Sequence, residues 1–232
     1  MGLMGLSALL LLTDARMPAG GHAHSGGIEA AVNAGAVRDA ADLGSFLRGR
    51  LITTGRVAGA VAAFACSRAA DPTAAIDPAG WAELDAEVGA RTPSPAQRDA
   101  SRAQARTLLR AARVAWPAPV LDLLARTRPG SHHSVALGAV AACAGCLPTE
   151  AALAGAYLAV TGPATAVVRL LGLDPLTVHA VLADLGPELD RVAAAAAAAA
   201  QGPLSELPST SAPRLDLLAQ AHARSELTLF AS

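Results

Sequence analysis

No stretch of this 232-residue sequence alternates β-branched or aromatic residues with polar ones, which is the pattern of a half-buried β-strand. The apolar content is 53%, and much of it is alanine, the residue with the highest helix propensity. Proline, glycine and aspartate recur between the apolar segments, where helices start and stop. The sequence therefore predicts an all-α protein, a single domain of roughly ten helices.

Some helix boundaries can be predicted at single residues. Asp39 or Asp42 is a candidate N-cap for a helix through Leu51, and Asp77, followed by Pro78, is a candidate N-cap for a later one. Further helices are expected over residues 57–70, 96–115, 120–126, 133–146, 150–171, 175–184, 187–200 and 213–226.

Two kinds of apolar segment could be a signal peptide or a membrane span, and the sequence argues against both interpretations. Residues 1–12 lack a charged n-region and lead into Thr13–Arg16, so we interpret them as a buried first helix and not as a signal peptide. The uncharged stretches 130–149 and 151–168 are interrupted by glycine, proline and polar residues. Within the second stretch, we expect a kink or break at Gly162–Pro163, because proline removes a helical hydrogen bond. The sequence predicts a cytoplasmic protein without a membrane partner.

Charge and composition exclude several classes of function. The formal net charge is −1 and aromatic residues make up 3%, which argues against a nucleic-acid partner. All eighteen basic residues are arginine, so a Schiff-base lysine and a P-loop lysine are both excluded.

Composition also divides the chain into three parts. Residues 1–200 form the predicted helical core, which ends in the alanine run Ala193–Ala200. Residues 201–212, rich in proline, serine and glycine, are predicted to be a linker. Residues 213–232 are predicted to form a C-terminal helix and a partner-binding tail.

The glycine-rich segment from Pro18 to Glu29 is the strongest local motif. His22 and His24 suggest a metal site, but two imidazoles need further ligands for stable binding, so they are weak candidates. Ser25 follows His24, and adjacent side chains rarely form a nucleophile–base pair, so a helix-capping role is the simpler interpretation. The remaining glycines favour one specific loop shape for helix packing.

Two other clusters allow a structural interpretation as readily as a functional one. Cys143 and Cys146 form a lone C-x-x-C without a second ligand pair, and we interpret them as small buried residues. Five arginines recur along one face of the predicted 96–115 helix, where they form either a docking ridge or a solvated face: Arg98, Arg102, Arg106, Arg110 and Arg113. The opposite face is expected to be buried: Ala105, Leu108, Leu109, Ala112 and Trp116.

The segment 9–29 resembles the N-terminal signature of the urease accessory protein UreF family. In that signature a leucine-rich helix precedes Asp-x-Arg-x-Pro-x-Gly-Gly, an aromatic residue and Ser-His-Ser-Gly-Gly-Leu-Glu. Further similar segments are Ser101–Gln104, His133–Gly138, Ala166–Leu170 and the ending from His222 to Ser232. The chain departs from the family pattern at His22, Ala23, Ala105, Asp174 and Thr228.

The resemblance implies a UreF-like helical bundle that is not an enzyme and that forms a homodimer. It implies a scaffold that bridges the accessory protein UreD and the GTPase UreG for nickel insertion into apo-urease, with nickel in transit and no tightly bound cofactor. The residues that it assigns to partner binding or to the structural motif are Pro18, Gly20, Gly21, His24, Ser25, Gly26, Gly27, Glu29, Arg169, His222, Leu229 and Phe230.

Individual roles follow for some of these residues. Glu29 is expected to supply a buried charge or a polar wall of a nickel route, and Leu229 and Phe230 are expected to anchor on UreD. Arg169 is assigned to the dimer or GTPase surface, or else to an internal pair. Two alternatives remain open at this point: a nickel-binding metallochaperone that uses His22 and His24 directly, and an unrelated helical enzyme with His24 or His133 as a base.

Overall fold

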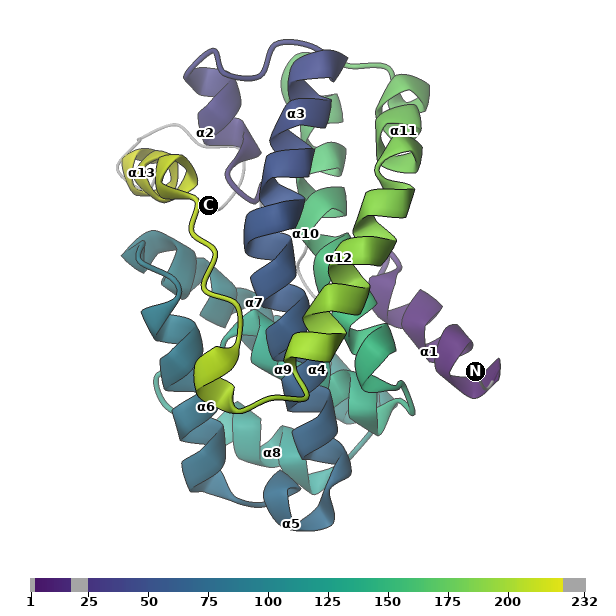
Figure 1. Cartoon of the computed structure of the whole chain (residues 1–232), viewed down its shortest axis with the longest axis vertical. Coiled ribbons are helices and arrows are strands. Elements are labelled where there is room, and N and C mark those ends of the chain that lie inside the picture. Colours follow the sequence, from purple (N-terminus) through teal and green to yellow (C-terminus); the bar gives the residue numbers. More distant parts are fainter. Residues whose placement is uncertain (1–2, 18–24, 223–232) are drawn as a thin grey trace.

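A computed structural model describes residues 3–17 and 25–222, and every regular element in these ranges is a helix (Figure 1). The prediction of an all-α domain is confirmed. In chain order the elements are α1 (Leu3–Thr13), α2 (Ile28–Asn33), α3 (Ala40–Arg50), the π-helix η2 (Leu51–Gly55), α4 (Arg56–Ala70), α5 (Pro72–Ala75), α6 (Pro78–Ala90), α7 (Pro95–Ala115), α8 (Pro119–Arg126), α9 (His133–Cys143), α10 (Pro148–Leu171), α11 (Pro175–Asp184), α12 (Gly186–Ala199), the 3₁₀-helix η3 (Leu204–Glu206) and α13 (Pro213–His222).

The predicted N-caps form as expected. The Asp39 carboxylate accepts a hydrogen bond from the backbone N–H of Asp42 at 2.9 Å, so Asp39, and not Asp42, is the N-cap of α3. Asp77 accepts from the N–H groups of Ala79 and Gly80 at the start of α6. These bonds satisfy donors that have no partner inside a helix.

Helices α3 and α4 are joined without a loop, because the π-helix η2 continues the backbone from one into the other. In Figure 1 the three elements form the long column at the centre of the molecule. A π-helical turn inserts one extra residue into a helix and is found frequently at functional sites. The junction therefore fixes how Arg50, the last residue of α3, is presented.

Helix α10 is the central element of the core. Its first half packs with α4 and α9 in one hydrophobic cluster, through residues such as Ala151 and Ala154. Its second half packs with α3, α11 and α12 in another cluster, through Val160 and Val167. The single helix thus joins the two clusters into one domain.

The alanine-rich composition is explained by close helix packing. A Cβ added to Gly155 on α10 would lie 2.9 Å from the carbonyl oxygen of Ala58, and one added to Gly59 on α4 would lie 2.9 Å from that of Ala152. Both distances are shorter than a normal carbon–oxygen contact. Only glycine lets these two backbones approach so closely.

Of the kink or break predicted at Gly162–Pro163, the break is wrong, since α10 runs continuously from Pro148 to Leu171. Proline at 163 cannot donate to the carbonyl of Ala159 four residues earlier. The side chain of Arg50 replaces the missing donor, with its Nε 2.7 Å from that carbonyl oxygen. A tertiary contact therefore satisfies the group that the proline leaves unpaired.

The first helix is less buried than the sequence suggested. Helix α1 packs against α10 and α9, and Ala8 and Leu12 are buried. Leu10 and Leu11, however, are 71% and 58% exposed, so one apolar face of α1 is uncovered. Helix α10 is long and apolar enough to cross a membrane, but 61% of its most apolar window is buried inside the fold, as in a core helix.

The segment predicted as a linker, 201–212, lies against the helical body. Arg91 at the end of α6 donates to the carbonyl oxygens of Leu207 and Pro208, and the side chain of Leu207 is 3% exposed. This attachment positions the start of α13.

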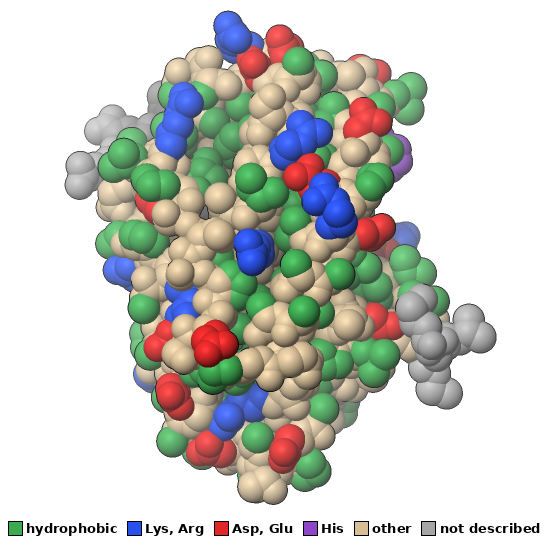
Figure 2. All heavy atoms as spheres, in the orientation of Figure 1, with side chains coloured by type: hydrophobic (Ala, Val, Ile, Leu, Met, Phe, Trp, Pro, Cys, Tyr) green, Lys and Arg blue, Asp and Glu red, His purple; other side chains and the backbone are tan. Residues whose placement is uncertain are grey.

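Acidic and basic side chains are interspersed on the face of the molecule shown in Figure 2. Elsewhere in the structure, acidic and basic side chains form ion pairs at the surface, such as Arg48 with Glu188 and Arg38 with Asp42. The face in Figure 2 therefore carries no single-sign field.

Candidate functional site

The glycines of the signature segment form a tight turn against α10. Gly26 and Gly27 have φ values of +59° and +87°, in the left-handed region that favours glycine. A Cβ at Gly26 would lie 2.9 Å from Pro163 Cγ and 3.1 Å from Arg50 Nη2. Gly26 is therefore required by its backbone conformation and also by its neighbours.

Ser25 does not cap the following helix, so this part of the prediction is wrong. Helix α2 begins at Ile28 with Gly27 as its N-cap, and no side chain caps it. The Ser25 side chain is fully buried, and its Oγ has no hydrogen-bond partner among the described residues. The left-handed glycines turn the chain between Ser25 and α2, which places the hydroxyl away from the free N–H groups.

Glu29 and His222 meet inside the fold, although 193 positions separate them. His222 Nε2 lies 3.4 Å from Glu29 Oε2, and each side chain is 4% exposed. The two residues form an ion pair when the imidazole is protonated. Helix α13 packs on α2 and α7, and Leu215 approaches Gly27. The structure thus brings together two residues that the sequence analysis had assigned separately.

Several assigned residues cannot be placed. The signature residues Pro18, Gly20, Gly21, His22 and His24 lie outside the residues that the structure describes. The tail residues Leu229 and Phe230 lie outside them as well, so their predicted roles stay predictions.

Arg169 lies on the exposed side of α10, so it is not a core arginine. Its side chain lines a cavity of about 850 Å³ that extends between α1, α7, α9, α10, α11 and α13. Gly26, Gly27 and Arg50 line the same cavity. The turn of the signature segment, the Arg50–Ala159 contact and α13 therefore border one internal space.

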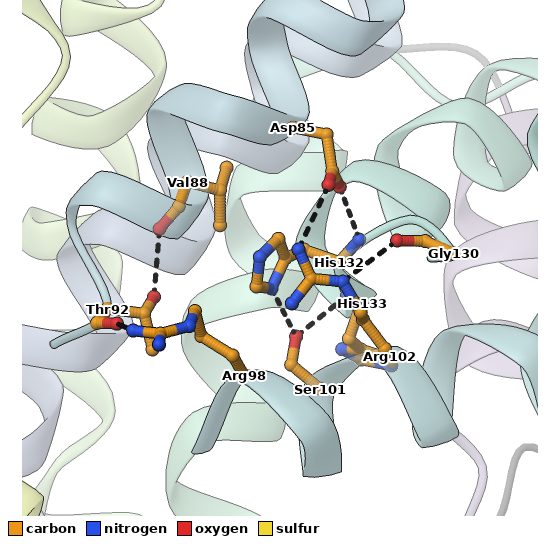
Figure 3. A network of polar contacts seen from close by, with 9 residues as sticks. All are labelled: Asp85, Val88, Thr92, Arg98, Ser101, Arg102, Gly130, His132 and His133. Atoms are coloured by element: carbon orange, nitrogen blue, oxygen red, sulfur yellow. Dashed lines mark hydrogen bonds and ion pairs between the residues drawn. The ribbon is translucent and has the colours of Figure 1, made fainter. Parts of the chain in front are cut away.

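A second polar cluster lies in the N-terminal half of α7 (Figure 3), and its Ser101 and His133 line the same cavity. Asp85 accepts a hydrogen bond of 2.6 Å from the backbone N–H of His132, and Arg102 Nη2 lies 3.4 Å from its other oxygen. Ser101 Oγ accepts from the N–H of His133 at 2.9 Å and lies 3.2 Å from His132 Nδ1. Arg102 also donates to the carbonyl of Gly130. These contacts fasten residues 130–133 to α6 and α7.

This cluster contains a serine, a histidine and an aspartate but lacks the geometry of a catalytic triad. In a triad the aspartate accepts from Nδ1 and the serine lies at Nε2. Here Ser101 lies at Nδ1, Asp85 binds the His132 backbone, and Nε2 is buried without a partner among the described residues. Burial, together with the charges of Arg102 and Arg98, lowers the pKa of His132 to about 4. The ring is therefore neutral at pH 7 and has a structural role.

Cys66 and Cys146 are buried thiols, whereas Cys143, which the sequence analysis also predicted to be buried, is half-buried. Cys66 Sγ donates to the carbonyl of Cys146, and Cys146 Sγ to that of Gly5. Burial raises the pKa of Cys66 to about 12 and that of Cys146 to about 11, which keeps both protonated. Helix α9 ends at Cys143, so Cys146 lies beyond it and not on the predicted helix. In the described ranges no three His, Cys, Asp or Glu side chains are grouped to hold a metal ion.

The arginine ridge on α7 is only partly a solvated face. Ala105, Leu108, Leu109 and Ala112 are buried as predicted, whereas Trp116, predicted with them, is only partly buried. On the other side, three of the five arginines bind within the chain: Arg98 to the carbonyl of Thr92, Arg102 to Asp85 and Arg113 to Asp122.

Comparison with known proteins identifies the family. A family model described as UreF matches residues 37–186. Over 227 residues, 98% of this chain and 99% of each relative, the chain is 47% identical to the urease accessory protein UreF of Mycolicibacterium vanbaalenii, 45% identical to that of Mycobacterium marinum and 40% identical to that of Mycobacterium tuberculosis. The chain belongs to the UreF family of urease accessory proteins. Its all-α fold and its signature turn are thus those of a UreF-family member.

Two departures from the family pattern have a structural explanation. Asp174 is the N-cap of α11, where it accepts from the N–H groups of Leu176 and Thr177. Ala105 is fully buried on the packed face of α7. Thr228 lies outside the described residues.

Proposed function

We propose that this UreF-family chain is a non-enzymatic scaffold of urease maturation that acts in the cytoplasm as a homodimer. It bridges UreD and the GTPase UreG while nickel, the cargo, passes to apo-urease. Family membership supports the link to urease. The contact between Glu29 and His222 supports the role proposed for the C-terminal segment, because it joins the signature turn to the helix that precedes the tail.

This contact supports a role of the C-terminal segment in partner binding. A tail that follows a helix fixed at His222 starts from a defined position on the body, which lowers the entropy lost when a partner binds it. Leu229 and Phe230 are the apolar residues of that tail and anchor it on UreD. The exposed leucines of α1, Leu10 and Leu11, supply further uncovered apolar surface of the kind that marks interaction sites.

Co-purification of UreD tests the anchoring role. We expect Leu229→Ser together with Phe230→Ser to weaken UreD binding by a few kcal/mol, the effect of losing a hot spot. Leu217→Ser is the matched control, since Leu217 is 72% exposed on α13 and carries no proposed role. Undiminished capture of UreD by the double variant would contradict the proposal. A chain truncated after Ser211 that still holds UreD would contradict it as well.

The second surface is tested with Arg169. We expect Arg169→Ala to reduce either dimer formation, measured by light scattering, or retention of UreG, measured by pull-down. Arg191→Ala is the control, because Arg191 is likewise exposed but lies on α12 and outside the cavity. Equal dimerisation and UreG retention in both variants would remove Arg169 from the proposed surfaces.

A further inference from the structure

The guanidinium of Arg50 is a half-buried cation that forms no ion pair with a carboxylate of the described residues. Its Nε donates to the carbonyl oxygen of Ala159 at 2.7 Å. Among the residues that the structure describes, it forms no ion pair, and its Nη1 and Nη2 atoms donate to no protein acceptor. Nη2 lies against Gly26, 3.1 Å from where a Cβ would be.

This arrangement leaves a half-buried charge without a carboxylate partner among the described residues. Burial lowers the pKa of Arg50 to about 10, so the side chain keeps its charge at pH 7. A single neutral carbonyl offsets little of the cost of removing a guanidinium from water. A cation that lines a cavity and has no carboxylate partner among the described residues is placed to receive an anionic ligand.

The local backbone holds Arg50 in this position. Nε is fixed on the carbonyl that Pro163 leaves free, and the π-helix η2 begins at the next residue, Leu51. The guanidinium plane is thus held before any ligand arrives. Pre-organisation of this kind increases affinity, because less side-chain freedom is lost on binding.

Among the described residues that line the cavity, no carboxylate is paired with Arg50. Two acidic residues, Asp14 and Asp216, line its wall. Asp14 is bound to Arg16, and Asp216 lies on α13. Arg91, on the same wall, is paired with Glu87, and Arg169, which also lines the cavity, is exposed on α10. Arg50 is the lining arginine whose Nε is fixed on a backbone carbonyl.

We propose that Arg50 binds a planar carboxylate-type oxyanion in this cavity through its Nη1 and Nη2 atoms. Two parallel N–H donors match the two oxygens of a carboxylate, which is the strongest geometry open to an arginine. The carboxylate belongs either to a small free anion or to an Asp or Glu side chain of a bound protein. In both cases the group that Arg50 binds is a carboxylate.

Arginine-specific labelling of the intact protein tests the proposal. Phenylglyoxal reacts with the two Nη atoms, and peptide mass spectrometry follows the rate at Arg50. At ten times its dissociation constant, acetate leaves about a tenth of the sites free and slows labelling of Arg50 about tenfold. Arg56, exposed at the other end of the π-helix, is the internal control whose rate stays unchanged.

A second arm distinguishes the two sources. The complex with UreD and UreG is labelled in chloride buffer without added carboxylate. Protection of Arg50 there, without protection by acetate in the isolated chain, assigns the carboxylate to a partner protein. Protection by acetate in the isolated chain assigns it to a small anion. Thermal unfolding adds a variant test: acetate stabilises the wild type and Arg56→Lys, but not Arg50→Lys, which lacks the planar fork.

Two results overturn the proposal. One is labelling of Arg50 that neither acetate nor the assembled complex slows. The other is protection by tetrahedral phosphate at lower concentration than by acetate, which would assign a different anion class. Failure of the complex to form contradicts the proposed scaffold function and leaves the acetate experiment intact.

Discussion

His222 Nε2 lies 3.4 Å from Glu29 Oε2, with both side chains almost completely buried. The pair connects the first turn of α2 with the last residue of α13, the last helix that the structure describes. Both residues belong to segments that resemble the UreF family, one near each end of the chain. Their contact holds these two segments together in the folded chain.

The Glu29–His222 pair is expected to stabilise the fold. His222→Ala removes the contact between the imidazole and a buried carboxylate, and we expect it to lower the free energy of unfolding by about 3 kcal/mol, as measured by urea denaturation. Leu217→Ala, on the exposed side of α13, changes it by less than about 0.5 kcal/mol. The double variant with Glu29→Gln should cost less than the sum of the two single changes. Strict additivity would mean that the two side chains do not interact.

Gly26 is expected to tolerate no side chain. Gly26→Ala adds a Cβ at positive φ and 2.9 Å from Pro163 Cγ, so we expect a loss of about 2–3 kcal/mol in unfolding free energy. Gly35→Ala separates the two causes, because Gly35 has φ +68° and nothing within 4 Å of its Cβ position. That variant should lose only about 1–2 kcal/mol. Equal losses would show that Pro163 does not crowd the turn.

The Arg50 donor and Pro163 are expected to be coupled. Arg50→Met leaves the Ala159 carbonyl without its donor, whereas Pro163→Ala restores a backbone N–H that can bind the same oxygen. Arg50→Met should therefore cost about 1 kcal/mol less in the Pro163→Ala background than in the wild type. Chemical denaturation of the four proteins gives this coupling free energy. A coupling of zero would mean that α10 does not need the arginine.

His132 is expected to make stability fall with acid. Its pKa is about 4 in the folded chain and 6.5 for the free side chain, so the unfolded state binds the proton first as the pH falls. The stabilisation is complete above pH 6.5 and is lost between pH 6.5 and about 4, by roughly 3 kcal/mol. Urea denaturation across this range should show a steeper loss for the wild type than for His132→Gln. Burial raises the pKa of Asp85, so this residue also makes stability depend on pH. Asp85 is present in both proteins, so its effect cancels when the wild type is compared with His132→Gln.

Much of the fold could be predicted because helix boundaries are encoded by local residues. Asp39 and Asp77 are N-caps in the sequence and in the structure, since capping depends only on neighbouring residues. The break at Pro163 was wrong for the opposite reason. The donor that satisfies Ala159 comes from Arg50, 109 positions away, and no local pattern contains it.

The candidate site could be predicted in composition but not in geometry. The signature resemblance singled out Gly26, Glu29 and His222, yet only the folded chain shows that Glu29 contacts His222. Arg102 was assigned to an arginine ridge by its helical spacing, which gives a side chain's direction and not its partner. Its position against Asp85 depends on how α6 packs on α7, and this is set by the tertiary structure.

The π-helix between α3 and α4 makes the length of this column of helix critical. Removing one residue from Leu51–Gly55 would restore ordinary α-helical spacing and rotate everything before it by about 100° relative to α4. Arg50 would then point away from Ala159 even though no side chain in its surroundings had changed. A one-residue deletion in the π-helix would therefore disturb the structure more than most substitutions do. Substitutions at Ile52, an exposed residue of the π-helix, leave the helix geometry intact.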